Sequence, residues 1–126
     1  MIGLPASVRI YLATEPTDMR NGADGLAARV RAGFAVSVFS GHLFVFLSKR
    51  RDRAKILWWD RGGFVVYYKR LERGRFKRPE PDSERGVVLS PAELQSLLEG
   101  IDLSRARRSR LWQPAIHEKI DGDRQV

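Results

Sequence analysis

The stretch "HLFVFLSKRRDRAKILWWDRGGFVVYYKRLE", residues 42–72, decides the fold class of this chain. It holds three runs rich in β-branched and aromatic residues, at 42–48, 54–60 and 64–72. The charged turn KRRDR separates the first two runs, and the tight turn RGG separates the last two. Because strands joined by such short connections pair antiparallel, the stretch predicts a three-stranded meander.

The flanking segments predict two more strands and a first helix. Residues 8–13, VRIYLA, alternate and are β-rich, and residues 87–89, VVL, form a shorter apolar run. Over residues 22–33 the apolar side chains recur at helical spacing, which predicts an amphipathic helix. Asp18 or Asn21 is placed to cap its start.

A second helix is predicted by "SPAELQSLLEGID", residues 90–102. Ser90 suits the N-cap, Pro91 suits the first helical position, and Glu93 completes a capping box. Gly100 suits the C-cap. The expected apolar stripe consists of Leu94, Leu97, Leu98 and Ile101.

These elements predict an α+β protein with an antiparallel β-meander sheet and at least two packed α-helices. The chain has 126 residues, of which 43% are hydrophobic, enough for one domain with its own core. We expect this domain to span residues 1–103. Residues 104–126 lack an apolar period and are basic, so they predict a tail that is mobile or becomes ordered on a partner.

The absence of cysteine and the shortness of the apolar runs narrow the class of protein. The chain has no cysteine, which excludes disulfides and thiolate chemistry and fits a reducing, cytoplasmic compartment. Its uninterrupted apolar runs are about five residues long, whereas a membrane helix needs about 20. We therefore expect a soluble protein without a membrane partner.

The charge is concentrated in one part of the chain. Residues 49–78 contain twelve basic and three acidic residues, a net +9 that exceeds the +8 of the whole chain. A second basic cluster lies at Arg105, Arg107, Arg108 and Arg110. Such asymmetry favours an anionic partner, nucleic acid first, over a basic surface kept for solubility.

The basic residues fall mainly at strand ends and turns. In an antiparallel meander, the first turn and the end of the third strand lie at the same end of the sheet. The two groups are therefore expected to form one surface suited to phosphates, called the basic rim below. Its members are Lys49, Arg50, Arg51, Arg53, Lys69, Arg70, Arg73, Arg75, Lys77 and Arg78.

Two aromatic pairs need explanation, Trp58 with Trp59 and Tyr67 with Tyr68. Neighbours in a strand point to opposite faces, so at most one of each pair can lie under a given helix. One Trp and one Tyr should share the second face. There they can pack under another helix, fill a dimer interface or stack on bases.

Catalytic and metal-binding patterns are weak. His42 and His117 lack the spacing of metal ligands, and such single histidines are usually structural. Four carboxylates could belong to a two-metal nuclease or transposase site, those of Asp18, Asp24, Asp60 and Glu72. Simpler roles explain them better: two lie near a helix start, one precedes a turn and one suits an ion pair. We expect no metal, no cofactor and no enzymatic activity.

Three stretches together closely resemble one protein family: "TDMRNGADGL", "FSGHLFVFLSKRRDRAKILWWDRGGFVVYYKRLERGRF" and "VVLSPAELQSLLEGID". The family comprises the small accessory proteins, often labelled TnpB, of a large group of bacterial insertion sequences. They are encoded upstream of a DDE transposase and are distinct from the RNA-guided nuclease that shares the label. The resemblance covers residues 2–103.

The resemblance implies a role in DNA transposition beside a separate catalytic subunit. Combined with the charge pattern, it favours a non-catalytic accessory factor that binds DNA through the basic rim. The alternative is a protein-interaction subunit that docks on the transposase without contacting DNA. A second copy of the chain is a further candidate partner.

Overall fold

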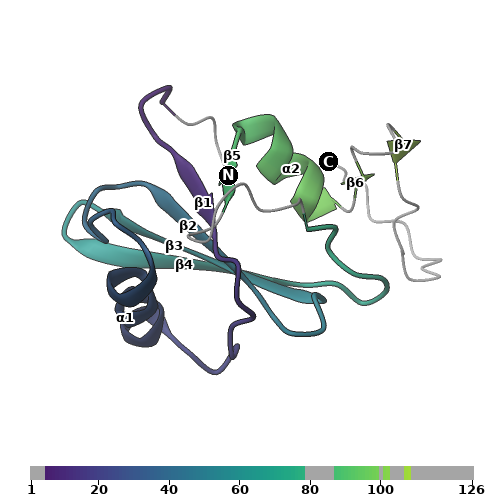
Figure 1. Ribbon diagram of the computed structural model, residues 1–126, viewed down its shortest axis with the longest axis horizontal. Coiled ribbons are helices and arrows are strands. Elements are labelled where there is room, and N and C mark those ends of the chain that lie inside the picture. Colours follow the sequence, from purple (N-terminus) through teal and green to yellow (C-terminus); the bar gives the residue numbers. More distant parts are fainter. Residues whose placement is uncertain (1–4, 79–86, 100, 103–106, 109–126) are drawn as a thin grey trace, which may run out of the picture.

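Five strands form one sheet in the order β4-β3-β2-β1-β5, with a helix on each side (Figure 1). The computed structural model describes residues 5–78, 87–99, 101–102 and 107–108. The sheet strands are β1 (Ile10–Leu12), β2 (Leu43–Leu47), β3 (Arg53–Asp60), β4 (Gly63–Arg70) and β5 (Val87–Leu89). The other elements are α1 (Ala23–Gly33), α2 (Pro91–Glu99) and the two-stranded pair β6 (Ile101–Asp102) and β7 (Arg107–Arg108).

The predicted meander is confirmed. β2 pairs antiparallel with β3, and β3 pairs antiparallel with β4 along the whole length of both strands. Arg61 and Gly62 connect β3 to β4, and both have positive φ, 45° and 87°. A two-residue turn of this kind matches the twist of the strands that it joins.

The first strand joins the sheet in a way that the meander pattern does not predict. β1 pairs parallel with β2, and α1 forms the crossover between them. β5 then adds antiparallel to the outer side of β1. The fold is therefore α+β, with a mostly antiparallel sheet that contains one parallel pair.

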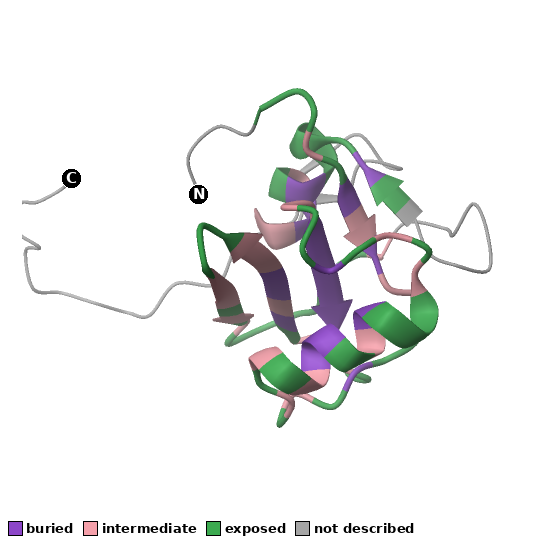
Figure 2. Cartoon of the chain, turned by 90° about the vertical axis from the view of Figure 1, so that its left-hand side faces the viewer, coloured by how far each residue is buried: buried purple, intermediate pink, exposed green. Residues whose placement is uncertain are grey.

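Each face of the sheet carries its own core. On the face of α1, Leu26, Ala27 and Val30 pack against Phe44, Phe46 and Leu57. On the face of α2, the buried residues are Ile10, Leu12, Leu43, Val45, Leu47, Ala54, Ile56, Phe76, Leu89, Leu94 and Leu97. Every residue of β2 is buried, because both of its faces are covered (Figure 2).

The adjacent aromatics divide between the two faces as alternation predicts. Trp58 and Tyr67 are partly buried against the core beneath α2. Trp59 and Tyr68 belong to the face of α1, since they pair in register with Phe64 and Lys55. Trp58 and Tyr67 therefore pack under the second helix, α2.

The predicted cap of α1 is wrong. Gly22 occupies the N-cap, and no side chain caps this helix. Asp18 instead accepts hydrogen bonds from Arg20, and the Asn21 side chain donates to the Asp18 carbonyl oxygen at 3.0 Å. Asn21 Oδ1 lies over Gly25, where a Cβ would collide with it. The polar side chains before α1 thus form hydrogen bonds within their own turn and do not cap the helix.

The capping box of α2 is confirmed, whereas the expected place of Ile101 on its apolar stripe is wrong. The Ser90 N–H donates to Glu93 Oε1 at 2.7 Å, and the Glu93 N–H donates to Ser90 Oγ at 3.1 Å. The helix ends at Glu99, and Ile101 lies in β6, paired with β7, instead of continuing the helical stripe. Apart from Arg107 and Arg108, the tail at 104–126 lies outside the described residues, as does Gly100.

Candidate nucleic-acid interface

Two basic segments meet at one end of the sheet. One is the β2–β3 turn at residues 48–52, and the other is the chain after β4, at residues 71–78. The Leu71 N–H donates to the Asp52 carbonyl oxygen at 2.7 Å, and the Phe76 N–H donates to the Arg51 carbonyl oxygen at 2.7 Å. Phe76 is also fully buried, so the second segment packs against the β2–β3 turn. The clusters of the basic rim are thus adjacent.

Most charges of the basic rim have no partner within the described residues. The side chains without a hydrogen bond or ion pair there are those of Lys49, Arg50, Arg51, Arg53, Arg73, Arg75, Lys77 and Arg78. All of these residues are exposed except Arg78, which is half-buried. Unpaired guanidinium and ammonium groups remain available to an external anion.

Two residues of the basic rim have structural partners. Lys69 Nζ donates to the Leu98 carbonyl oxygen at 2.7 Å, so this ammonium group is tied to the end of α2. Arg70 forms an ion pair with Glu72 at 2.9 Å. The hydrogen bond to Glu72 raises the pKa of the Arg70 guanidinium further above its ordinary value. The ion-pair role expected for Glu72 is confirmed.

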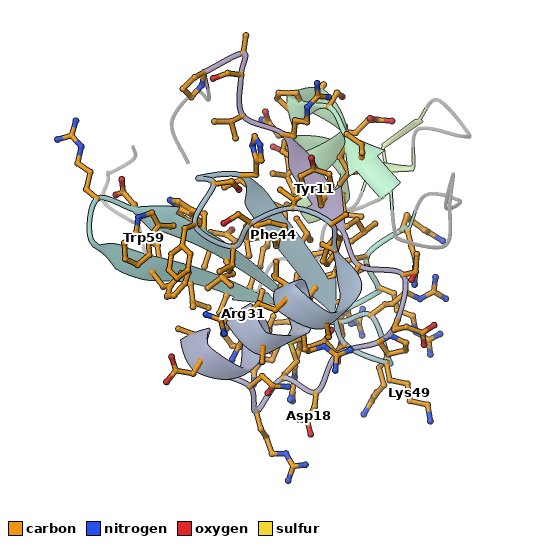
Figure 3. All side chains as sticks on the ribbon, turned by 60° about the vertical axis from the view of Figure 1, so that its left-hand side comes forward. Tyr11, Asp18, Arg31, Phe44, Lys49 and Trp59 are labelled. Carbon is orange, nitrogen blue, oxygen red and sulfur yellow. The ribbon has the colours of Figure 1, made fainter. Side chains whose placement is uncertain are left out.

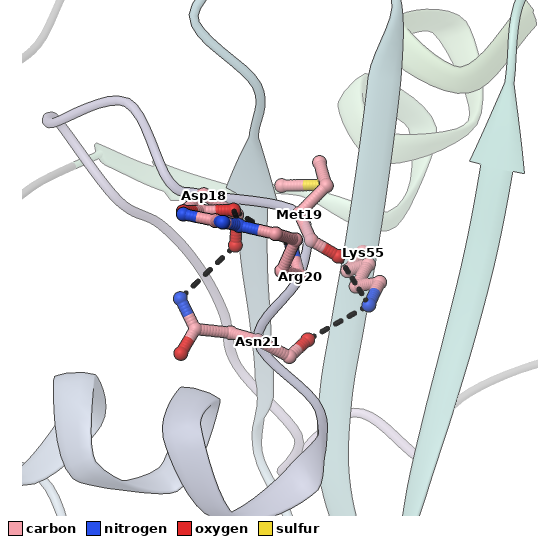
Figure 4. A network of polar contacts seen from close by, with 5 residues as sticks. All are labelled: Asp18, Met19, Arg20, Asn21 and Lys55. Carbon is pink, nitrogen blue, oxygen red and sulfur yellow. Dashed lines mark hydrogen bonds and ion pairs between the residues drawn. The ribbon is translucent and has the colours of Figure 1, made fainter.

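The turn before α1 lies beside β3 and is held by the half-buried ammonium group of Lys55 (Figure 4). Lys55 Nζ donates to the carbonyl oxygens of Met19 at 2.9 Å and Asn21 at 2.7 Å. Arg20 and Asp18 form an ion pair at 2.6 Å across the same turn. The side-chain and backbone hydrogen bonds from Arg20 lower the pKa of Asp18 from 3.8 to about 2. The same pairing raises the pKa of Arg20.

This arrangement creates an open depression of about 440 Å³ next to the basic rim. The turn before α1 forms one side of it, and the β2–β3 turn forms another. Its lining residues are Asp18, Met19, Arg20, Ser48, Lys49, Arg50, Asp52, Arg53 and Tyr68. The sequence analysis missed Arg20, whose side chain is 92% exposed, and it weighed Tyr68, which is 49% exposed, for base stacking without placing it beside the basic rim. Their spacing along the chain gives no signal, because only the fold brings them to residues 49–53.

An aromatic cluster lies at the other end of the sheet. The ring centroid of Trp59 is 5.1 Å from that of Phe39 and 5.0 Å from that of Phe64. Phe39 is 53% exposed, and the Arg31 guanidinium lies 6.0 Å from its ring centroid. Figure 3 shows Trp59 at one end of the molecule and Lys49 at the opposite end.

The remaining polar residues that the sequence analysis weighed have structural partners or lie apart. His42 Nδ1 accepts a hydrogen bond from the Arg9 N–H at 3.0 Å, which is the structural role expected for it. His117 lies outside the described residues. Within the described part of the chain, no three histidine or acidic side chains are grouped closely enough to hold a metal ion.

The fold and this surface define a small α+β protein with a strongly basic end. The profile of the family described as "IS66 Orf2 like protein" matches residues 8–108. The chain therefore belongs to the IS66 Orf2-like family, which associates it with transposition as an accessory protein.

Curated relatives share most of the chain. It is 37% identical over 114 residues to the Sinorhizobium fredii protein y4jC, covering 90% of this chain and 97% of the relative. It is 38% identical over 108 residues to y4hO of the same organism, covering 86% and 91%. Both are described as uncharacterized proteins.

No solved structure matches the chain significantly. Within the described residues, no helix has the length and apolar character needed to cross a membrane.

Proposed function

We propose that this protein is a non-catalytic accessory factor of DNA transposition, which binds DNA through the basic rim and assists a separate transposase. The observation that carries the proposal is the set of unpaired cations at one end of the sheet. Eight of the ten residues of the basic rim have no side-chain partner within the described residues. A protein surface that concentrates positive charge without internal neutralisation favours a polyanion.

The kind of contact follows from where these side chains lie. They extend from turns and strand ends, so they can reach phosphate oxygens along a DNA backbone. Phosphate contacts fix the position of a protein on DNA but carry no sequence information. We therefore expect binding that is steeply dependent on salt and weakly dependent on sequence.

A salt titration tests the proposal. DNA affinity is measured at several salt concentrations, on unrelated duplex sequences, for the wild-type protein and a variant with Arg50, Arg51, Arg73 and Arg75 changed to Ala. The variant should fold normally, bind more weakly to every sequence and show a slope smaller by about 0.9 per lost phosphate contact. A folded variant with wild-type affinity and slope would remove the basic rim from the mechanism.

The aromatic cluster of Phe39, Trp59 and Phe64 favours a second function, docking on the transposase. An exposed aromatic ring held against two others is typical of interface anchors. Because the cluster and the basic rim lie at opposite ends of the sheet, one surface can be altered without the other. Copurification of the transposase with wild type but not with Phe39→Ser, in nuclease-treated samples, would support this function. Loss of transposase only in the arginine variant would contradict it.

A further inference from the structure

We propose that Tyr68 and the depression beside it form a subsite for one unpaired nucleotide of a DNA strand. The inference rests on the proposed DNA binding and goes beyond it, because it names a single-stranded feature of the ligand. The ring of Tyr68 would stack on the base, and Lys49, Arg50 and Arg53 would hold the neighbouring phosphates.

The first support is the exposure of Tyr68. It is 49% exposed, although Phe64 and Val66, which precede it on the same face of β4, are partly buried against the core beneath α1. Phe39 is the other strongly exposed aromatic residue of the described chain, and its ring already contacts the rings of Trp59 and Phe64. The Tyr68 ring has no aromatic neighbour within the described residues, so it has room for an external one.

The second support is the way in which the ring is held. Lys55 Nζ lies 5.5 Å from the Tyr68 ring centroid, and Met19 and Asn21 fix this ammonium group through their carbonyl oxygens. The Lys55 ammonium is therefore not free to pair with a phosphate. It orders one side of the ring before any ligand arrives, which lowers the cost of binding.

The third support is the charge around the ring. Lys49, Arg50 and Arg53 line the same depression and have no side-chain partner within the described residues. The two acidic residues that line it are engaged, since Asp18 pairs with Arg20 and Asp52 Oδ1 accepts from Ser48 Oγ at 3.2 Å. The depression therefore offers positive charge beside an aromatic face.

An aromatic face beside cations that have no partner within the described residues suits single-stranded nucleic acid, because every base has a π-face that can stack. In an intact duplex both faces of each base are already stacked inside the helix. The Tyr68 ring can therefore contact a base only where the DNA is unpaired.

The test compares single-stranded and duplex DNA. Affinities of the full chain for oligo-dT and for a duplex of equal length are measured at one fixed salt concentration. Tyr68→Leu keeps an apolar side chain without an aromatic face and should weaken oligo-dT binding roughly 5- to 150-fold, the range for one stacked base. Tyr68→Phe keeps the face and should restore wild-type affinity. Duplex binding should change little in either variant.

The outcomes separate this inference from the proposed function. Unchanged oligo-dT affinity in Tyr68→Leu would overturn the subsite, and so would an equal loss on both kinds of DNA. If Tyr68→Leu does not fold, Tyr68→Thr, which suits an exposed strand, replaces it with the same expectations. Salt-sensitive duplex binding that needs the four arginines, without any effect of Tyr68, would refute the subsite alone. Absence of binding to either DNA would refute both proposals.

Discussion

Arg53 on β3 and Arg70 on β4 are direct cross-strand partners, and of the two only Arg70 forms an ion pair within the described residues. Like charges directly opposite each other destabilise a sheet. Glu72 offsets the charge of Arg70, whereas Arg53 faces solvent at the edge of the depression without a partner in the described residues. The pair is therefore a place where a bound phosphate would relieve repulsion that the free protein carries.

The first prediction follows from this pair. Arg53→Gln should leave the free energy of unfolding unchanged or raise it by up to roughly 1 kcal/mol, because the cross-strand repulsion is removed. The same variant should bind DNA more weakly, with a salt slope smaller by about 0.9. Arg9→Gln, which removes an exposed charge outside the basic rim, is the matched control and should keep the slope. Clear destabilisation by Arg53→Gln would show that Arg53 is a structural residue.

The second prediction concerns Lys55. Lys55→Met removes the ammonium that bonds the Met19 and Asn21 carbonyl oxygens, and it should lower the free energy of unfolding by about 1.5–3 kcal/mol. Lys49→Met changes an exposed lysine without such bonds and should leave stability nearly unchanged. Urea denaturation of both variants measures the difference. Equal midpoints would mean that the Lys55 contacts contribute nothing to the fold.

The third prediction concerns the start of α2. Ser90→Ala removes the hydroxyl that accepts from the Glu93 N–H and should cost about 0.5–2 kcal/mol. Ser96→Ala makes the same chemical change inside the helix, where no cap is lost, and serves as the control. Thermal or urea unfolding would report the loss. A Ser90→Ala midpoint no lower than that of Ser96→Ala would contradict the capping role.

The fourth prediction concerns pH. The pKa of Asp18 is lower in the folded protein than its ordinary value, so the Arg20 pair stabilises the fold above about pH 3.8. That contribution is lost as the pH falls through about 2. The difference in stability between wild type and Asp18→Asn should therefore shrink over this interval. Carboxyl-carbon NMR should give a pKa of about 2 for wild type and a higher value for Arg20→Gln. An unchanged pKa in Arg20→Gln would remove the guanidinium as its cause.

Much of the basic rim is predictable from the chain. The turn at 49–53 and the end of the third strand belong to neighbouring antiparallel strands, so hairpin geometry alone places them together. Trp58 and Trp59 lie on opposite faces of the sheet because side chains alternate along a strand, which is also a local property of the sequence. Lys69 is the exception among the predicted site residues, because its contact with the Leu98 carbonyl depends on where α2 docks.

The sequence by itself determined the meander, the capping box of α2 and the concentration of charge, because each depends on residues close together in the chain. Tertiary structure decided the parallel pairing of β1 with β2 and the place of the turn before α1 beside Lys55 and Tyr68. Met19 and Lys55 are 36 residues apart. No local propensity encodes such a contact, since it forms only when two cores bury both faces of one sheet and bring distant segments together.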